Sequence, residues 1–278
     1  METLFLCPVC GDTLTRTAQA LRCPAGHSFD VAAAGYVHLL PSGRMHTRTP
    51  GDDRAMAAAR SRFLNGGWYG PLADRLAELC LALATRDPVV IDSGCGEGYY
   101  TAHLAAALRQ AGQIPRIAGI DISKECIRRA AKRSGDIEYA VASAFALPFR
   151  DSAADVLLNC FAPLALSEFR RVLRPGGLLL CVVPGPRHLW ELKEILYDAP
   201  YENQEDFVAC EGFRLLDAVR VETAMALPSR EALSDLFAMT PYFWKTPRAG
   251  RARLEQLDAL TVTAQFGVHV YRREDDTL

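Results

Sequence analysis

The segment 89–100, VVIDSGCGEGYY, restricts the possible fold more than any other part of the chain. Its apolar, β-branched start at 89–91 is typical of a buried parallel strand. Three glycines then recur at every second position, Gly94, Gly96 and Gly98. Glycine adopts positive φ without strain and allows the backbone to approach a ligand closely. The segment therefore predicts a strand, a tight turn beside a small ligand, and a helix.

The glycine spacing narrows the kind of ligand. The pattern is GxGxG, which differs from the GxGxxG of dinucleotide dehydrogenases and from the GxxxxGK[ST] of phosphate loops. S-adenosylmethionine is the leading remaining candidate. Asp121 supports a nucleoside ligand, because it ends the predicted strand 117–121 about 25 positions later. A carboxylate there can accept hydrogen bonds from both ribose hydroxyls.

Strand-like and helix-like runs alternate through the rest of the chain, which predicts an α/β fold with a doubly wound, Rossmann-like sheet and helices on both faces. With 278 residues, the chain can form one large domain and a small additional module. The predicted strands are 89–93, 117–121, 138–142, 156–161 and 178–183, followed by an antiparallel pair, 213–226 and 260–272. The predicted helices are 53–64, 71–84, 99–110, 124–133 with Ser123 as its cap, and 231–238.

A zinc-ligand pattern occupies the N-terminal region. Cys7 and Cys10 form a CxxC, and Cys23 and His27 form a CxxxH twelve residues later. Two such pairs on short turns can bring four donors together around one tetrahedral Zn²⁺. A redox CxxC is the alternative, but it would lie beside a βαβ unit and needs no second pair. We therefore expect one structural zinc ion in a recognition module at 1–40, followed by a helical connector at 41–88.

Charge gives a weaker indication of the partner. The formal net charge of −2 does not indicate a nucleic-acid partner. The connector nevertheless carries a local group of cations that can contact phosphates, although a solvated helix face is the more ordinary reading. These residues are Arg44, His46, Arg48, Arg54, Arg60 and Arg62. No long uncharged apolar run and no signal-peptide pattern are present, so we expect a cytoplasmic protein without a membrane partner.

Several motifs together resemble a known family. The segments 92–98, 147–149 and 173–177, with Asp121, resemble the successive motifs of class I S-adenosylmethionine-dependent methyltransferases. The combination of CPxC, CPxGHxFDxAxxGYVxLL, PGD, DxGCGEGYYT, FAP and PGPRHLxELK is similar to the RlmA-type 23S rRNA (guanine-N1)-methyltransferases. This resemblance implies methyl transfer to N1 of a guanine in a hairpin of domain II of 23S rRNA. It also implies that the zinc module helps to hold the hairpin, and it suggests a homodimer.

The resemblance implies roles for individual residues. The cofactor-binding residues are Tyr69, Asp92, Gly94, Gly96, Glu97, Asp121, Ser143 and His188. Ser143 stands where many methyltransferases carry an aspartate for the adenine amino group, so it supplies a weaker acceptor. Asn159 and Phe161 follow the fourth predicted strand, where nitrogen methyltransferases hold the acceptor base. Phe161 would stack on the guanine, and Asn159 or a main-chain carbonyl would take the N1 hydrogen; a purely structural Phe161 is the alternative.

Two other functions remain open from the sequence. One is a small-molecule methyltransferase whose zinc ribbon only stabilises the fold. Removal of residues 1–40 would distinguish it, because such an enzyme should stay active wherever the large domain stays folded. The other is a zinc-containing RNA-binding protein with a degenerate cofactor site, and the intact glycine turn argues against it.

Overall fold

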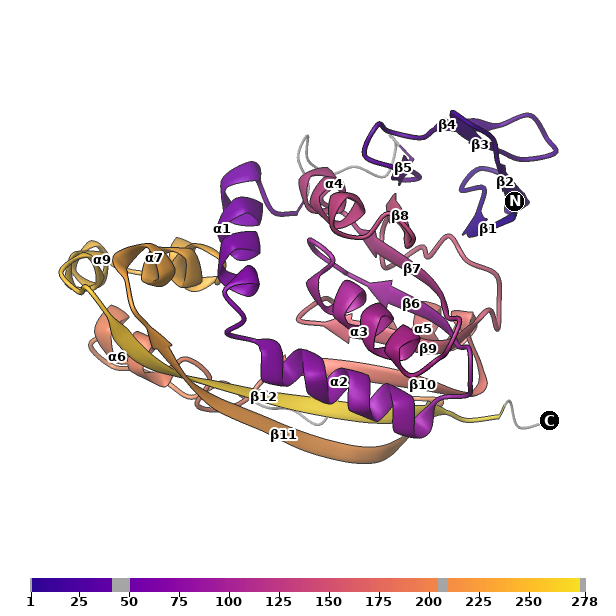
Figure 1. Cartoon of the computed structure of the whole chain (residues 1–278). Coiled ribbons are helices and arrows are strands. Elements are labelled where there is room, and N and C mark those ends of the chain that lie inside the picture. The colour runs from indigo at the N-terminus through magenta and orange to yellow at the C-terminus, as the bar shows by residue number, and fades with distance from the viewer. Residues whose placement is uncertain (1, 42–50, 205–209, 276–278) are drawn as a thin grey trace.

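The computed structural model describes residues 2–41, 51–204 and 210–275. An eight-stranded sheet with the order β11-β12-β10-β9-β6-β7-β8-β5 forms its centre (Figure 1). Its parallel part consists of β5 (Val37–His38), β6 (Val89–Ser93), β7 (Arg116–Asp121), β8 (Glu138–Val141), β9 (Ala154–Cys160) and β10 (Leu173–Pro184). The predicted Rossmann-like α/β class is confirmed.

Two long antiparallel strands complete one edge of this sheet. They are β11 (Phe213–Leu227) and β12 (Leu260–Arg273), and β12 also pairs with β10. The predicted terminal pair is therefore present. β10 begins five residues earlier than predicted, at Leu173, and its register shifts before Leu178. Gly176, with φ +74°, accommodates this irregularity.

Five predicted helices lie within one residue of their predicted bounds. They are α1 (Arg54–Asn65), α2 (Gly70–Leu83), α3 (Tyr99–Gln110), α4 (Lys124–Arg133) and α7 (Arg230–Ala238). Side-chain caps fix two of the starts. Asp53 accepts hydrogen bonds from the backbone N–H groups of Ala55 and Met56, and Ser123 accepts one from Cys126. These bonds satisfy amide donors that a first helical turn leaves unpaired.

Helices and other segments cover both faces of the sheet. Val90, Leu158 and Leu180 point to one face, where they share a buried cluster with residues of α2, α3 and α4. Ile91 and Leu157 point to the opposite face, toward α5 (Leu166–Val172) and the N-terminal module. Figure 1 shows α2 and α3 in front of the sheet. The alternation follows from the period of two along a strand.

The N-terminal module contains a four-stranded sheet of β1 (Glu2–Leu6), β2 (Thr13–Arg16), β3 (Ala20–Arg22) and β4 (Ser28–Asp30). It is packed against the large sheet. The rings of Phe5 and Phe149 lie 5.4 Å apart, and the N–H of Leu6 donates to the carbonyl of Pro148 at 2.8 Å. β5 then pairs with β8. Removal of residues 1–40 would strip an edge strand from the large sheet and expose its core, so it cannot separate RNA recognition from folding.

Four short helices were not predicted from the sequence: α5, α6 (Trp190–Leu196), α8 (Tyr242–Lys245) and α9 (Arg248–Glu255). Helices this short depend on tertiary contacts more than on intrinsic propensity. α6 and α9 pack so closely that a Cβ on Gly250 would lie 2.1 Å from the carbonyl oxygen of Leu196. Within the described ranges, no helix is both long and apolar enough to cross a membrane.

Candidate active site

A cavity of about 870 Å³ opens at the carboxyl ends of the parallel strands. This edge is where open α/β sheets bind their ligands. Nine of the ten predicted cofactor and catalytic residues line the cavity: Tyr69, Gly94, Gly96, Glu97, Asp121, Ser143, Asn159, Phe161 and His188. The tenth, Asp92, lies buried behind the glycine turn, with 1% of its surface exposed. The structure therefore brings residues from the whole large domain to one place.

The glycine turn has the conformation that its sequence predicts. Gly94, Gly96 and Gly98 have φ values of +86°, +55° and +78°. A Cβ on Gly94 would lie only 2.4 Å from Cβ of Ala162, so no larger residue fits. A Cβ on Gly96 would meet no atom within 4 Å. The turn therefore needs glycine for its backbone and leaves open space for a ligand.

Two buried carboxylates lie at this turn. Asp92 Oδ2 accepts a hydrogen bond from Thr101 Oγ1 at 2.6 Å, and burial raises the pKa of Asp92 to about 7. Glu97 forms an ion pair with Arg133, but burial still raises its pKa. Asp92 Oδ1 and Glu97 Oε1 have no hydrogen-bond partner in the described part of the chain. Unpaired buried acceptors suit a cationic ligand group, such as the amino group of S-adenosylmethionine.

Asp121 is fixed at the end of β7. Its Oδ2 accepts a hydrogen bond from the N–H of Gly96 at 3.0 Å, and its Oδ1 accepts one from Ser123 at 2.7 Å. Burial raises the pKa of Asp121, and these backbone donors oppose that shift. Each carboxylate oxygen keeps a second lone pair for a ribose hydroxyl. Ser143 lies on the same cavity wall, and its Oγ accepts a hydrogen bond from Phe145.

Tyr69 and His188 meet on the opposite side of the cavity. The N–H of Gln265 donates to Nδ1 of His188 at 3.2 Å, so the neutral ring carries its hydrogen on Nε2. That nitrogen lies 3.4 Å from Oη of Tyr69. Burial lowers the pKa of His188 to about 3, so the ring is neutral near pH 7. Phe266 packs against both rings, with centroid distances of 4.8 Å.

Asn159 and Phe161 follow β9, as predicted. Asn159 Nδ2 donates to the carbonyls of Ser93 and Pro163 at 3.2 and 3.3 Å, which leaves Oδ1 as its accepting atom. Phe161 has φ +56°, a conformation that costs a bulky residue about 1–3 kcal/mol. Its ring is 45% exposed and lines the cavity, so it is not part of the buried core.

The connector cations that were predicted as possible phosphate contacts lie in different environments. Arg44, His46 and Arg48 lie outside the described residues. Arg60 forms an ion pair with Asp52, and Arg62 binds Asp235 of α7 at 2.5 Å. These two ion pairs tie α1 to its surroundings. The interpretation of Arg60 and Arg62 as free phosphate contacts is therefore not supported by their geometry.

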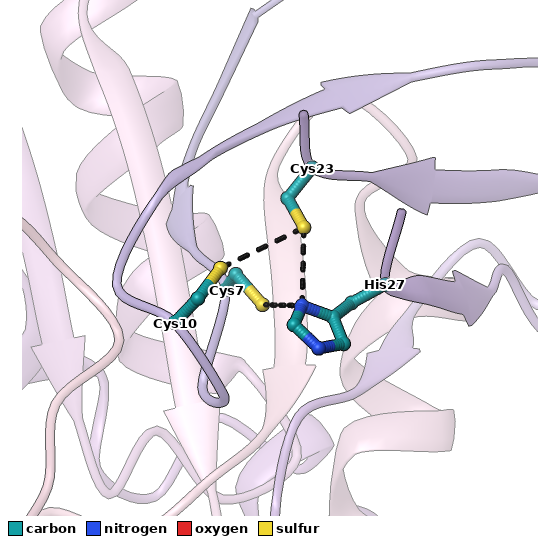
Figure 2. A group of neighbouring side chains, drawn as sticks. All are labelled: Cys7, Cys10, Cys23 and His27. Carbon is teal, nitrogen blue, oxygen red and sulfur yellow. Dashed lines mark hydrogen bonds between the residues drawn. The ribbon is translucent and has the colours of Figure 1, made fainter. Parts of the chain in front are cut away.

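The four predicted zinc ligands converge in the N-terminal module, where Figure 2 shows their side chains pointing toward one another. All donor atoms lie within 4.8 Å of one another, with Cys10 Sγ 3.7 Å from Cys23 Sγ and 3.3 Å between Cys23 Sγ and His27 Nδ1. Zn–S bonds of about 2.3 Å in a tetrahedron imply sulfur–sulfur distances near 3.8 Å. The set therefore fits a closed, structural Zn²⁺ site.

Other cavity residues carry no recognisable sequence signal. Tyr201, Asn203, Tyr242 and Lys245 line the cavity from the segment after α6 and from α8. They are separated along the chain and belong to no spaced motif. Only the PGPRHLWELK segment, which leads into α6, marked this region in the sequence.

The sheet order, the glycine turn with its acidic partners and the zinc cluster define a class I S-adenosylmethionine-dependent methyltransferase with a structural zinc ribbon. Residues 5–48 match the family model described as RlmA, N-terminal, and residues 91–181 match a methyltransferase domain model. A solved structure provisionally called a type II methyltransferase, from Anaeromyxobacter dehalogenans, shares the fold. Its TM-score is 0.50 at 23% identity, covering 73% of this chain and 97% of that one.

Curated relatives make the assignment more specific. A Streptomyces fradiae protein named 23S rRNA (guanine(748)-N(1))-methyltransferase is 38% identical, over 86% of this chain and 85% of that protein. A Micromonospora griseorubida protein provisionally named 23S rRNA (guanine-N(1)-)-methyltransferase is 37% identical over 96% of both chains. The chain belongs to the RlmA-type 23S rRNA (guanine-N1)-methyltransferase family. Its cofactors are S-adenosylmethionine and one zinc ion.

Proposed function

We propose that this chain transfers a methyl group from S-adenosylmethionine to N1 of a guanine in a hairpin of domain II of 23S rRNA. One observation carries the proposal. The chain combines a match to the RlmA N-terminal model with a methyltransferase domain, and a relative whose name states methylation of guanine N1 in 23S rRNA is similar to it over 96% of its length. A small-molecule methyltransferase would require no such combination.

The proposed roles of the cofactor residues follow from their positions. Bound S-adenosylmethionine supplies an electrophilic methyl group on its sulfonium. Asp121 would accept the ribose hydroxyls, Ser143 would contact the adenine, and the backbone at Gly94 and Gly96 would border the methionine part. Glu97 would offer its unpaired oxygen to its amino group, and Asp92 would support the turn from its buried position, while Tyr69 and His188 would close the far side. The enzyme then mainly has to align the acceptor nitrogen with the methyl group.

Asn159 and Phe161 are proposed to hold the guanine. The ring of Phe161 faces the cavity and would stack on the base, as aromatic side chains do with unstacked RNA bases. The N–C bond forms on the base as the S–C bond of the cofactor breaks, and N1 loses its proton. Asn159 Oδ1 would accept the N1–H hydrogen bond and orient that proton for release to solvent.

Further organisation follows from the family resemblance. Residues 1–40 would recognise the RNA, residues 41–88 would connect, and residues 89–278 would carry out catalysis in the cytoplasm. β5 of the first segment pairs with β8 of the large sheet, so the proposed recognition segment and the proposed catalytic domain share one sheet. A homodimer remains a prediction, and sedimentation velocity of the full chain tests it.

Transfer of labelled methyl groups tests the proposed function. The full chain should label deproteinised 23S rRNA, and digestion should yield N1-methylguanine. A Gly94→Val variant, whose cofactor site is disrupted, is the negative control. Labelling of small molecules or protein, without labelling of rRNA, would instead support the small-molecule methyltransferase.

A further inference from the structure

Three of the most exposed aromatic residues gather at one cavity. Among the described residues, four aromatic side chains are largely exposed: Phe145 (64%), Phe161 (45%), Tyr201 (54%) and Trp244 (66%). Phe145, Phe161 and Tyr201 line the cavity, whereas Trp244 does not. Such clustering is unusual, because exposed apolar side chains are normally scattered singly over a surface.

The three rings that line the cavity lie at different parts of it. Phe145 lies two residues after Ser143, on the proposed adenine side, and Phe161 lies at the proposed guanine position. Tyr201 follows α6, in a segment that supplies no predicted cofactor residue. The cavity volume of about 870 Å³ lies near the upper end of the range for small-molecule sites, which is roughly 300–1,000 Å³. We therefore assign Tyr201 to the side left for the acceptor.

A buried lysine holds Tyr201 in place. Lys193 has no exposed surface, and its Nζ donates to the carbonyl of Tyr201 at 2.8 Å and to Asn203 Oδ1 at 2.7 Å. The same nitrogen lies 4.6 Å from the centre of the Tyr201 ring. Asn203 Nδ2 in turn donates to the carbonyl of Gly185 at 2.8 Å. A buried ammonium is costly unless it is hydrogen-bonded, so Lys193 favours the backbone conformation that provides these acceptors. The lysine thereby fixes the backbone beneath an exposed ring.

A cation also lines the cavity near this segment. Lys245 of α8 is a lining residue, and its positive charge can contact a phosphate next to a stacked base. A large, pre-positioned ring such as that of Tyr201 loses little conformational entropy when a partner stacks on it.

We infer that Tyr201 is a stacking surface for an unpaired nucleobase next to the target guanine. This inference rests on the proposed function, because it needs an RNA acceptor. N1 of a paired guanine is occupied by its Watson–Crick partner, so the target must leave the helix, and its neighbours lose stacking. Aromatic rings at the cavity mouth would replace that lost stacking regardless of base identity.

Fluorescence with the full-length protein tests the inference. The probe is a synthetic hairpin of 23S rRNA domain II with 2-aminopurine next to the target guanine. Tyr201→Ala should weaken binding about tenfold or more, since base–aromatic stacking has this effect on alanine substitution. It should also remove the protein-induced change in 2-aminopurine emission. Tyr201→Phe should retain both, and Ile114→Ala, at an 81% exposed site, is the matched control.

The possible outcomes separate the two proposals. A Tyr201→Ala variant that binds the hairpin within twofold of wild type and keeps its emission change would overturn the stacking role, while wild-type methylation of rRNA would leave the proposed function intact. A loss of S-adenosylmethionine affinity in Tyr201→Ala would also overturn the stacking role, because the ring would then serve the cofactor. If wild type neither binds the hairpin nor methylates rRNA, the proposed function fails and this inference fails with it.

Discussion

The phenol oxygen of Tyr69 lies 3.4 Å from Nε2 of His188, although the two residues are 119 positions apart. Tyr69 directly precedes α2, and His188 follows β10. Phe266 of β12 packs against both rings, so three separate segments form this wall of the cavity. The neutral state of His188 is part of the arrangement, because burial lowers its pKa to about 3.

His188→Gln should change how stability depends on pH. Histidine in an unfolded chain has a pKa near 6.5, whereas His188 in the folded protein has a pKa of about 3. Between these values the unfolded state binds more protons, so the free energy of unfolding falls as pH drops below 6.5. The variant should lose this contribution, which amounts to at most about 1.4 kcal/mol for each pH unit between 6.5 and 4. Urea unfolding of both proteins from pH 4 to 7 measures it.

The comparison must use slopes and not absolute stabilities. Asp92 has a raised pKa of about 7 and acts with the opposite sign in the same pH range. It is present in both proteins, so it cancels in the difference. Parallel pH profiles for wild type and His188→Gln would contradict a buried, neutral His188.

Gly94→Val should abolish cofactor binding. The new Cβ would clash with Ala162 at 2.4 Å, and the backbone would hold a β-branched residue at φ +86°. We expect affinity for S-adenosylhomocysteine to fall about 100-fold or more, as measured by calorimetry. Gly135→Ala is the matched control, because its Cβ meets no atom within 4 Å. Equal affinities in the two variants would refute the cofactor site at this turn.

Phe161→Ala should lower methyl transfer to rRNA and leave cofactor affinity within about twofold. Its ring is exposed to the cavity, so its removal deletes the proposed stacking surface and creates no core void. Loss of one base–aromatic contact corresponds to about a tenfold weaker complex or more. Phe161→Tyr should restore activity. Normal kcat/KM for Phe161→Ala would exclude the stacking role.

Cys7→Ser should release zinc and destabilise the N-terminal module. Loosening of the module should also disturb the cavity. Phe5 packs on Phe149 and Leu6 donates to the carbonyl of Pro148, and both partners lie close to Ser143. We expect a lower Tm and RNA binding weakened more than cofactor binding. Zinc content, thermal unfolding and both affinities are the measurements. Val9→Ser, at a 63% exposed site in the same loop, is the control and should retain zinc.

Local patterns in the sequence predicted much of this molecule. The strand–glycine–helix segment, the CxxC and CxxxH pairs and the amphipathic helices each carry their signal within a few residues. Ser123 was read correctly as a cap, and α3 has its predicted bounds. Because the residues that identify each of these elements lie close together in the chain, a single sequence is enough to find it.

Features that depend on distant partners were missed. β5 has two residues and exists because β8 offers it an edge. Arg60 and Arg62 appeared as a cationic group, but Asp52 and Asp235 bind them, and Asp235 lies on α7. Nothing in the sequence indicated that the ammonium group of Lys193 is buried beneath Tyr201. Spacing cannot show which charges will be paired after folding.

Primer extension on 23S rRNA tests the central claim most directly. Unmodified 23S rRNA is incubated with the full chain and S-adenosylmethionine, and reverse transcription is compared with a reaction that contains Gly94→Val. A methyl group on N1 blocks Watson–Crick pairing, so the account predicts one new stop next to a guanine in a domain II hairpin. Identical extension products in both reactions, with the wild-type protein folded and bound to cofactor, would contradict it.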